Sequence, residues 1–151
     1  MALKEADVQA GILVVERQFG YLLLHGGTAS VKAASSAVLG SLGVDATAAT
    51  PPRVLASRII TSVDGQHAFL VNRNKLGSMV LPGESLFVLE CQPASYAIRA
   101  ANEAEKAAQI KLVDYRMVGA TGRLYLSGRE DDVRQASDTV TGLFGSAGGT
   151  S

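Results

Sequence analysis

The sequence is poor in the side chains that build metal sites, disulfide frameworks and catalytic pairs. Its single cysteine, Cys91, excludes an internal disulfide framework and any cysteine-cluster metal site. It has only two histidines. Neither His25 nor His67 has a carboxylate, a cysteine or a second histidine at the spacing of a metal site or a catalytic pair. We therefore predict no catalytic residue, no metal and no cofactor.

Net charge is also absent. Fourteen basic and fourteen acidic side chains give a formal net charge of +0 at neutral pH. This balance removes the electrostatic footprint expected of a nucleic-acid-binding protein and argues against an anionic membrane as a partner. Zero net charge also lowers the barrier to self-association. The composition thus favours partners that are other protein molecules, including copies of the same chain.

Long hydrophobic runs are missing as well. The first ten residues, MALKEADVQA, lack the basic start and the apolar run of a signal peptide, and nothing approaches the length of a membrane-spanning helix. We expect a cytoplasmic protein. The hydrophobic content of 47% is enough for an ordinary core, and 151 residues allow one domain or two very small ones.

The most regular part of the chain, residues 86–145, predicts the order strand, helix, strand, short loop, strand, helix. Residues 86–90 form an apolar strand closed by a charge, and a helix begins near Pro93, which a first turn tolerates. One face of that helix is an apolar stripe made mostly of alanine: Ala94, Ala97, Ile98, Ala101, Ala104 and Ala108. Such a stripe allows another element to approach closely.

The second half of this segment is a strand pair followed by a helix. Residues 110–115 alternate as a half-buried strand, and Leu124 and Leu126 belong to its partner across a loop of small residues. Acidic residues at 130–132 mark a helix start, where the macrodipole favours them. The expected buried face of this last helix is Val133, Ala136, Val140, Leu143 and Phe144.

The first 75 residues begin with a predicted hairpin of strands at residues 11–16 and 21–24. A helix follows from Thr28 to Gly43, and residues 45–52 read as a loop. Residues 53–63 form a further strand, and residues 66–75 form a short helix or an irregular arm.

The chain repeats itself once. The segment GYLLLHGGTASVKAASSAVLGSLG from Gly20 returns as GRLYLSGREDDVRQASDTVTGLFG from Gly122, at an offset of 102 residues. The matched positions include Leu22/Leu124, Leu24/Leu126, Gly26/Gly128, Val31/Val133, Ala34/Ala136, Val38/Val140 and Gly43/Gly145. Such an offset fits a whole domain and is too long for a solenoid repeat. The first copy lacks the strand and helix that precede the second, so the duplication is partial.

The pattern of residues 86–145 resembles the bacterial microcompartment (BMC) shell domain, and its later part is similar to the circularly permuted branch of that family. The resemblance is carried by Glu90, Ala97-Ile98, Lys106-Ala107-Ala108, Leu112-Val113, Tyr115 and Val118-Gly119. It implies an α+β fold, a layered antiparallel or mixed sheet with helices on one face, with a partial internal duplication. We therefore expect residues 1–50 to be a strand-strand-helix extension, residues 51–146 a permuted shell domain, and residues 147–151 a flexible tail.

The resemblance also implies a structural role in a microcompartment shell. The expected partners are the chain itself, as a homo-hexamer or a trimer, and other shell proteins. In the family, the loop between the second and third strands lines a pore on the ring axis. Here that position holds Val118, Gly119, Ala120, Thr121 and Gly122, which suit the passage of small polar metabolites. Lys106 falls at the family's edge between neighbouring hexamers, whereas Thr61-Ser62-Val63-Asp64 replaces its Pro-Arg-Pro-His edge motif.

Two other hypotheses remain open from the sequence. One is a small oligomeric regulatory or ligand-binding α/β protein that binds an anion at a helix start, near Thr28 or Glu130. The other is an enzyme that uses Cys91 or His67. Without the resemblance, residues 118–122 would be a plain hairpin turn, Lys106 a solvated helix residue and Cys91 a small buried hydrophobic residue.

Overall fold

The structure, a computed structural model, describes residues 6–45 and 50–147. Its contacts divide the chain into two units, Met1–Thr50 and Pro51–Ser151, which are called unit 1 and unit 2 below. Each unit has its own hydrophobic core. Among the helices of the described residues, none is long and apolar enough to cross a membrane.

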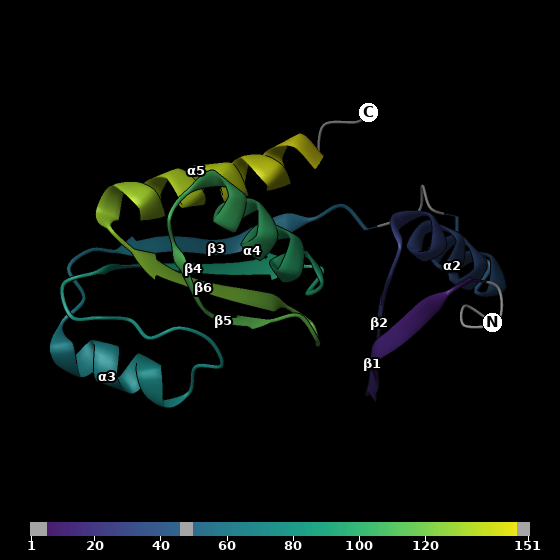
Figure 1. Ribbon diagram of the computed structural model, residues 1–151, viewed down its shortest axis with the longest axis horizontal. Helices are drawn as coiled ribbons and strands as arrows, with labels where there is room; N and C mark the ends of the chain where they lie inside the picture. Colours follow the sequence, from purple (N-terminus) through teal and green to yellow (C-terminus); the bar gives the residue numbers. More distant parts are fainter. Residues whose placement is uncertain (1–5, 46–49, 148–151) are drawn as a thin grey trace. The chain divides into compact units, whose positions relative to one another are not determined.

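Unit 1 is a hairpin followed by a helix (Figure 1). Strand β1 (Val8–Glu16) pairs antiparallel with β2 (Phe19–Gly26), and helix α2 (Thr28–Ser41) follows. The small core under α2 consists of Val8 and Ala34, with Leu24, Val31 and Val38 packed against them. A hairpin alone is only marginally stable in water. The stability of unit 1 therefore depends on the small core between the hairpin and α2.

Unit 2 is a four-stranded antiparallel sheet with three helices (Figure 1). Its elements are β3 (Arg53–Ile60), α3 (Gly65–Arg73), β4 (Ser85–Gln92), α4 (Tyr96–Ala107), β5 (Lys111–Arg116), β6 (Gly122–Gly128) and α5 (Glu130–Ala147). The strand order is β3-β4-β6-β5, and every neighbouring pair is antiparallel. Strands β4 and β5 therefore run parallel with β6 between them, and α4 makes the crossover that this arrangement needs.

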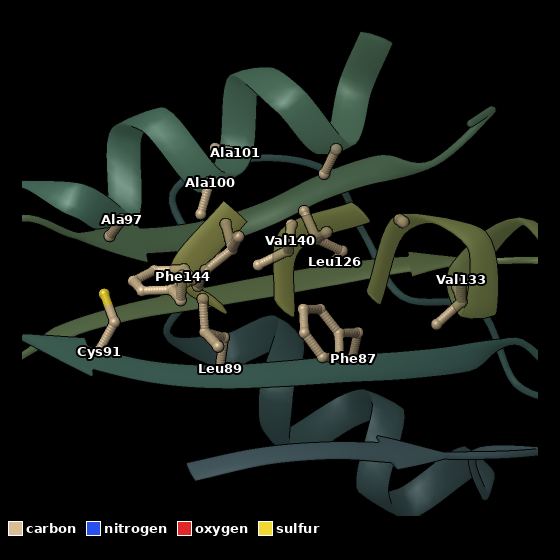
Figure 2. Packing of buried hydrophobic residues seen from close by; sticks show 13 residues of the cluster. Phe87, Leu89, Cys91, Ala97, Ala100, Ala101, Leu126, Val133, Val140 and Phe144 are labelled. Atoms are coloured by element: carbon tan, nitrogen blue, oxygen red, sulfur yellow. The ribbon is translucent and has the colours of Figure 1, made fainter. Parts of the chain in front are cut away.

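Helices α4 and α5 cover one face of the sheet and bury the main core (Figure 2). Phe87, Leu89 and Cys91 alternate along β4 and point into this core, because successive strand residues face opposite sides. The buried stripe of α4 is Ala97, Ala100, Ala101 and Ala104. The predicted alanine stripe is thus largely present, but Ala100 takes the buried place we assigned to Ile98, which is half-buried.

The last helix buries the face predicted for it. Val133, Ala136, Val140 and Phe144 are at most 5% exposed, and Leu143 packs partly against them. The predicted α+β fold is confirmed, with one addition: α3 lies across the opposite face of the sheet from α4 and α5 (Figure 1). There Val63, Ala68, Val80, Leu86 and Val113 form a second core. Strand β4 is therefore apolar on both faces because both are covered.

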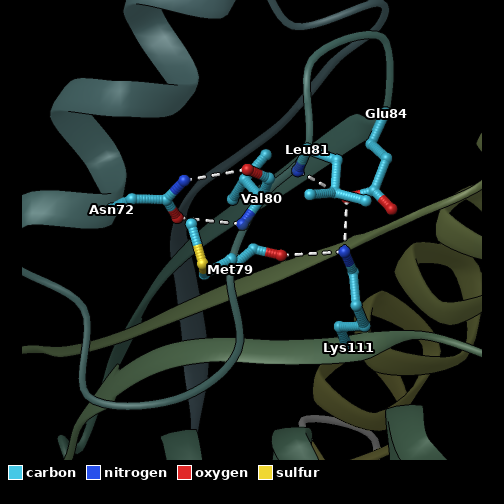
Figure 3. A network of polar contacts seen from close by, with 6 residues as sticks. All are labelled: Asn72, Met79, Val80, Leu81, Glu84 and Lys111. Carbon is cyan, nitrogen blue, oxygen red and sulfur yellow. Dashed lines mark hydrogen bonds and ion pairs between the residues drawn. The ribbon is translucent and has the colours of Figure 1, made fainter.

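Residues 74–84, which are called the arm below, run from α3 along the outer edge of β5. Gly77 N donates to Val113 O at 2.9 Å and Ser78 N to Leu112 O at 2.8 Å, which satisfies backbone groups of an otherwise open edge. A Cβ on Gly77 would lie 2.4 Å from Leu112 O, so only glycine permits this approach. The Asn72 side chain fixes the arm to α3 through two hydrogen bonds with the Val80 backbone (Figure 3).

Several element boundaries differ from the sequence-based expectation: for example, β1 begins at Val8 and not at residue 11, and β3 ends at Ile60 and not at residue 63. Residues 93–95 form a bend and a turn, so α4 begins at Tyr96 and not near Pro93. At the other end of the unit, α5 continues to Ala147, so residues 145–147 are helical. The remaining four residues of the expected tail, 148–151, lie outside the described residues.

The hairpins of the two units share one register at the offset of 102 residues. Leu13 lies opposite Leu22 in unit 1, and Tyr115 lies opposite Leu124 in unit 2. Each hairpin also has one irregularity at the same place, between Ala10 and Ile12 and between Leu112 and Asp114. Pairing, irregularity and the helix that follows therefore recur together, as a duplicated segment would.

Unit 2 is expected to fold without unit 1. Both of its cores are formed only by residues within 54–144, so removing residues 1–49 takes no side chain from either. A chain that starts at Thr50 should keep a cooperative urea transition with an unchanged midpoint, followed by circular dichroism. Aggregation of this shortened chain, or a broad transition, would show that unit 1 completes the core of unit 2.

Candidate pore loop and oligomer surfaces

The predicted pore loop is the connection between β5 and β6, residues 117–121. Ala120 is exposed, whereas Val118 and Gly119 are partly buried. Gly119 has φ +110°, a backbone conformation that favours glycine. Gly122, which we placed in the loop, is the first residue of β6 and is buried. The loop tip is therefore small: Ala120, whose side chain is a single methyl group, is exposed, and the other loop residues are partly buried.

A carboxylate on β4 holds the base of this loop. Thr121 Oγ1 donates to Glu90 Oε1 at 2.7 Å, and Arg123 Nε lies 3.7 Å from the same oxygen. The Glu90 side chain is 31% exposed, so the ion pair is only partly screened by water. These contacts connect the loop to a strand that is distant in sequence.

The end of the loop also packs closely on the turn before α4. A Cβ on Gly122 would lie 2.3 Å from Ala94 O, which is closer than real Cβ atoms approach oxygen. Gly122 therefore permits the contact between β6 and the backbone of residue 94. The loop leaves the sheet from a fixed position.

Two hollows lie beside the loop. One, of about 510 Å³, is lined by the arm and β5 and includes Leu76, Asp114 and Val118. The other, of about 240 Å³, lies on the α3 face and includes Lys75, Arg116 and Arg123 together with Asp114. Within residues 6–45 and 50–147, no three His, Cys, Asp or Glu side chains gather as a metal site would require.

Lys106, the expected edge residue, lies in the last turn of α4. Its side chain is 63% exposed and pairs with Glu103 Oε1 at 3.1 Å. This hydrogen bond and the lysine charge lower the pKa of Glu103. A cation in the last turn is favourable to the helix dipole, so Lys106 has a local role as well as an exposed ammonium.

The segment that replaces the family's edge motif is a helix cap. Ser62 has φ +52°, Val63 is 2% exposed, and Asp64 caps α3 by accepting a hydrogen bond from Gln66 N at 2.9 Å. Its apolar residue thus packs inward. In the structure, residues 61–64 start α3, and they do not contain the Pro-Arg-Pro-His edge motif.

Within unit 2, Cys91 and His67, the two residues considered for catalysis, differ in exposure. Cys91 is 0% exposed, and its burial raises the pKa of the thiol to about 11, so the protonated thiol is favoured at neutral pH. His25 and His67 are exposed and belong to different units.

The anion sites considered at helix starts are not supported. At the start of α5, Glu130 pairs with Arg134 at 2.6 Å, and Asp131 and Asp132 add further negative charge, which repels an anion. At the start of α2, Gly27 occupies the cap position and Thr28 is the first helical residue. No other feature marks that helix start as a ligand site.

A lysine–glutamate pair anchors the arm and was not predicted. Lys111 Nζ lies 2.6 Å from Glu84 Oε2 and donates to Met79 O at 2.8 Å, while Leu81 N donates to the same carboxylate (Figure 3). Burial by itself raises the pKa of Glu84, but the Leu81 hydrogen bond and the Lys111 ammonium together bring it below its ordinary value of 4.5.

Glu84→Gln is expected to lower the free energy of unfolding of unit 2 by about 1 kcal/mol at neutral pH. Because the folded-state pKa of Glu84 is below the unfolded value, its contribution is full above that value and is lost as the pH falls through the folded pKa. Urea unfolding at about pH 7 and about pH 3 should therefore show the wild type and the variant converging in acid. The exposed Glu105 supplies the control variant Glu105→Gln. An equal difference in unfolding free energy between wild type and Glu84→Gln at both pH values would contradict the stabilising role of the Lys111–Glu84 pair.

The sequence matches two family descriptions. Residues 1–48 match the CsoS1D N-terminal domain, and residues 85–149 match the BMC domain. Over 139 residues the chain is 43% identical to the carboxysome shell protein CsoS1D of Hydrogenovibrio crunogenus, covering 91% of this chain and 68% of that protein. Over 134 residues it is 43% identical to the carboxysome shell protein CcmP of Synechococcus elongatus, covering 88% of this chain and 63% of that protein. The chain thus spans less than two thirds of CcmP.

Solved structures agree. A fused permuted hexameric shell protein from the RMM microcompartment superposes with a TM-score of 0.93 at 68% identity, over 98% of this chain and 76% of that one. A double ringed trimeric shell protein from the same microcompartment gives a TM-score of 0.91 at 46% identity, over 95% and 73%. Fold and relatives together define a class, the microcompartment shell proteins with a permuted domain. The chain belongs to the BMC-domain family of that class, and the resemblance seen in the sequence is confirmed.

Proposed function

We propose that the protein is a structural component of a bacterial microcompartment shell, in which copies of the chain form a closed ring. The observation that carries this proposal is the match over 98% of the chain to a hexameric shell protein at 68% identity. Because one similar protein is hexameric and the other is trimeric, the relatives support a ring of either six or three chains. We expect no catalytic role, because the thiol of Cys91 is buried in the main core and the shell-protein relatives point to a structural role.

The surface of unit 2 supports association. Several large apolar side chains are exposed on the arm and α3, among them Phe69, Leu76, Met79 and Leu81, at 65%, 87%, 55% and 52%. Exposed apolar groups that cluster on one region are typical of protein interfaces. Zero net charge leaves no overall repulsion between copies. In a ring, these residues would be covered by neighbouring subunits.

Within such a ring, the loop of residues 117–121 is the proposed pore lining. A loop that its own base contacts hold in place, with a small exposed tip, suits a narrow opening on a symmetry axis. Backbone amides and the Thr121 hydroxyl would favour small polar metabolites. Lys106 is proposed for the contact between neighbouring rings, where its exposed ammonium can reach a partner.

Light scattering at micromolar concentration tests the ring. The expected result is a mass of three or six chains, with ring-shaped particles in electron micrographs. A clean monomer across this range would overturn the shell proposal. Leu76→Glu, at a large apolar side chain that is 87% exposed, should weaken the assembly, whereas Glu105→Gln should leave it intact.

A further inference from the structure

A charged hollow of about 240 Å³ lies on the sheet face that α3 covers (Figure 1). It is called the α3 hollow below. Its apolar lining comes from Leu70 and Val71 of α3 and from Val113 of β5. Its polar lining comes from the chain just after α3 and from β5 and β6: Asn74, Lys75, Asp114, Arg116, Arg123 and Tyr125. The α3 hollow thus combines an apolar wall with charged groups of both signs.

Two arginines lie opposite each other where β5 and β6 lead into the loop. Arg116 on β5 is the direct cross-strand partner of Arg123 on β6, and like charges in such a pair destabilise the sheet. Glu90 offsets part of this repulsion, because its Oε1 lies 3.7 Å from Arg123 Nε, whereas Arg116 forms no ion pair with any described residue. Lys75, the third cation of the hollow, donates to Gly77 O at 2.7 Å. An anion between the two guanidinium groups would remove the remaining repulsion.

A buried carboxylate oxygen gives a second, independent observation. Asp114 is the cross-strand partner of Tyr125, so both side chains lie on the α3 face of the sheet. Asp114 Oδ1 is buried and has no hydrogen-bond partner among the described residues. None of the cations that line the hollow forms an ion pair with Asp114 in the described part of the chain. Because buried acceptors in folded proteins nearly always have a donor, this oxygen is suited to accept a hydrogen bond from a bound molecule.

The charges and the unpaired oxygen select the kind of ligand. Three cations and one carboxylate line the hollow, and Glu90 adds a second carboxylate beside it. The sum leaves one positive charge in excess, which favours an anionic ligand over a neutral or cationic one. Guanidinium groups bind carboxylates and phosphates through paired hydrogen bonds. The oxygen of Asp114 adds the requirement for a donor, which a hydroxyl group on the same ligand meets.

We propose that the α3 hollow binds a small hydroxylated anion, whose carboxylate or phosphate head lies between Arg116 and Arg123. A hydroxyl group of the same molecule donates to Asp114 Oδ1. Val71 and Val113 contact the carbon atoms that join the two groups. This binding site goes beyond the proposed structural role, and it does not depend on the pore or on the ring size.

Saturation-transfer NMR with the full chain at low ionic strength measures the binding. The probes form two matched pairs: lactate with propionate, which lacks the hydroxyl, and glycerol phosphate with glycerol, which lacks the anion. Lactate should bind about tenfold more tightly than propionate, because its hydroxyl adds a hydrogen bond to a charged acceptor. Glycerol phosphate should bind more tightly than glycerol by at least as much, because glycerol has no charge for the arginines. The tighter of lactate and glycerol phosphate identifies the head group.

Two variants separate the role of the anionic head from that of the hydroxyl. Arg116→Gln should weaken the binding of lactate and of glycerol phosphate by about tenfold or more, because it removes a charged donor. This variant also removes a like-charge pair, so its urea midpoint should not fall and the loss of binding is not a loss of folding. Asp114→Ala should keep the binding of propionate and abolish the preference for lactate, because it removes the acceptor and leaves the cations. Arg99→Gln, at an exposed position of α4 on the other side of the sheet, is the control and should leave every affinity unchanged.

Three results would overturn the proposal. The first is that neither lactate nor glycerol phosphate binds at millimolar concentration. The second is equal affinity for these anions in the wild type and in Arg116→Gln, since the head would then lie elsewhere. The third is a preference for lactate over propionate that survives Asp114→Ala, since the hydroxyl would then have another partner.

Discussion

Gly122→Ala is expected to lower the free energy of unfolding of unit 2 by about 3 kcal/mol. The new Cβ would lie 2.3 Å from Ala94 O and 3.0 Å from Ala94 Cα, so backbone must move to admit it. Neither neighbour is the end of a flexible side chain, and Gly122 itself is held in the ladder opposite Cys91. Equilibrium urea unfolding, followed by circular dichroism, measures the loss.

A matched glycine gives the control. Gly142 lies within α5, and a Cβ there would meet no atom within 4 Å, so Gly142→Ala should raise the free energy of unfolding by about 1 kcal/mol. The same chemical change thus has opposite signs at two positions in one unit. If both variants are stabilised, the close approach of β6 to residue 94 is wrong.

Local patterns predicted most of the elements. The alternation of β5, the apolar run of β4 and the helical spacing in α5 each specify an element within a dozen residues, and all three are present. The sequence-based predictions were wrong where packing against distant residues decides which side chain is buried. Ala100 and not Ile98 is buried in α4, because the close packing of α4 against the sheet favours the smaller side chain. The helix start near Pro93 failed because a turn occupies residues 93–95.

Contacts between distant parts of the chain could not be predicted from the sequence. The arm pairs with β5 across more than thirty positions, through Gly77 and Ser78, and no local signal marks either residue as a strand partner. No local signal predicts the Lys111–Glu84 pair either. Each needs the sheet order to be known first, because that order decides which residues become neighbours.

The candidate pore loop was only partly predictable. Its position follows from the resemblance and from the glycines at 119 and 122, whose roles differ: one provides a positive φ and the other a close approach. From the sequence, Glu90 is the charge that closes a strand and one of the residues that carry the resemblance. Its contacts with Thr121 and Arg123 became visible when β4 and β6 were adjacent.

Ala120→Trp is expected to slow the entry of a small polar substrate into assembled shells by on the order of tenfold, because one indole per subunit would fill a narrow axial opening. In the proposed ring, symmetry would place every copy of the substituted side chain at the same opening, so a single change would act three or six times. Ala120 is exposed at the loop tip, and the loop base keeps its contacts with Glu90 and Ala94. Stability should therefore change by less than about 0.5 kcal/mol.

The measurement compares the rate of an encapsulated enzyme in wild-type and variant shells with its rate after the shells are opened. Opening should restore equal rates, which separates restricted entry from damage to the enzyme. Asp138→Trp, on the exposed side of α5, adds the same side chain away from the loop and should leave entry unchanged. Equal slowing by both variants would point to a general disturbance of packing. Normal entry through intact Ala120→Trp shells would place the transport route elsewhere, because an indole ring at a narrow axial constriction must obstruct it.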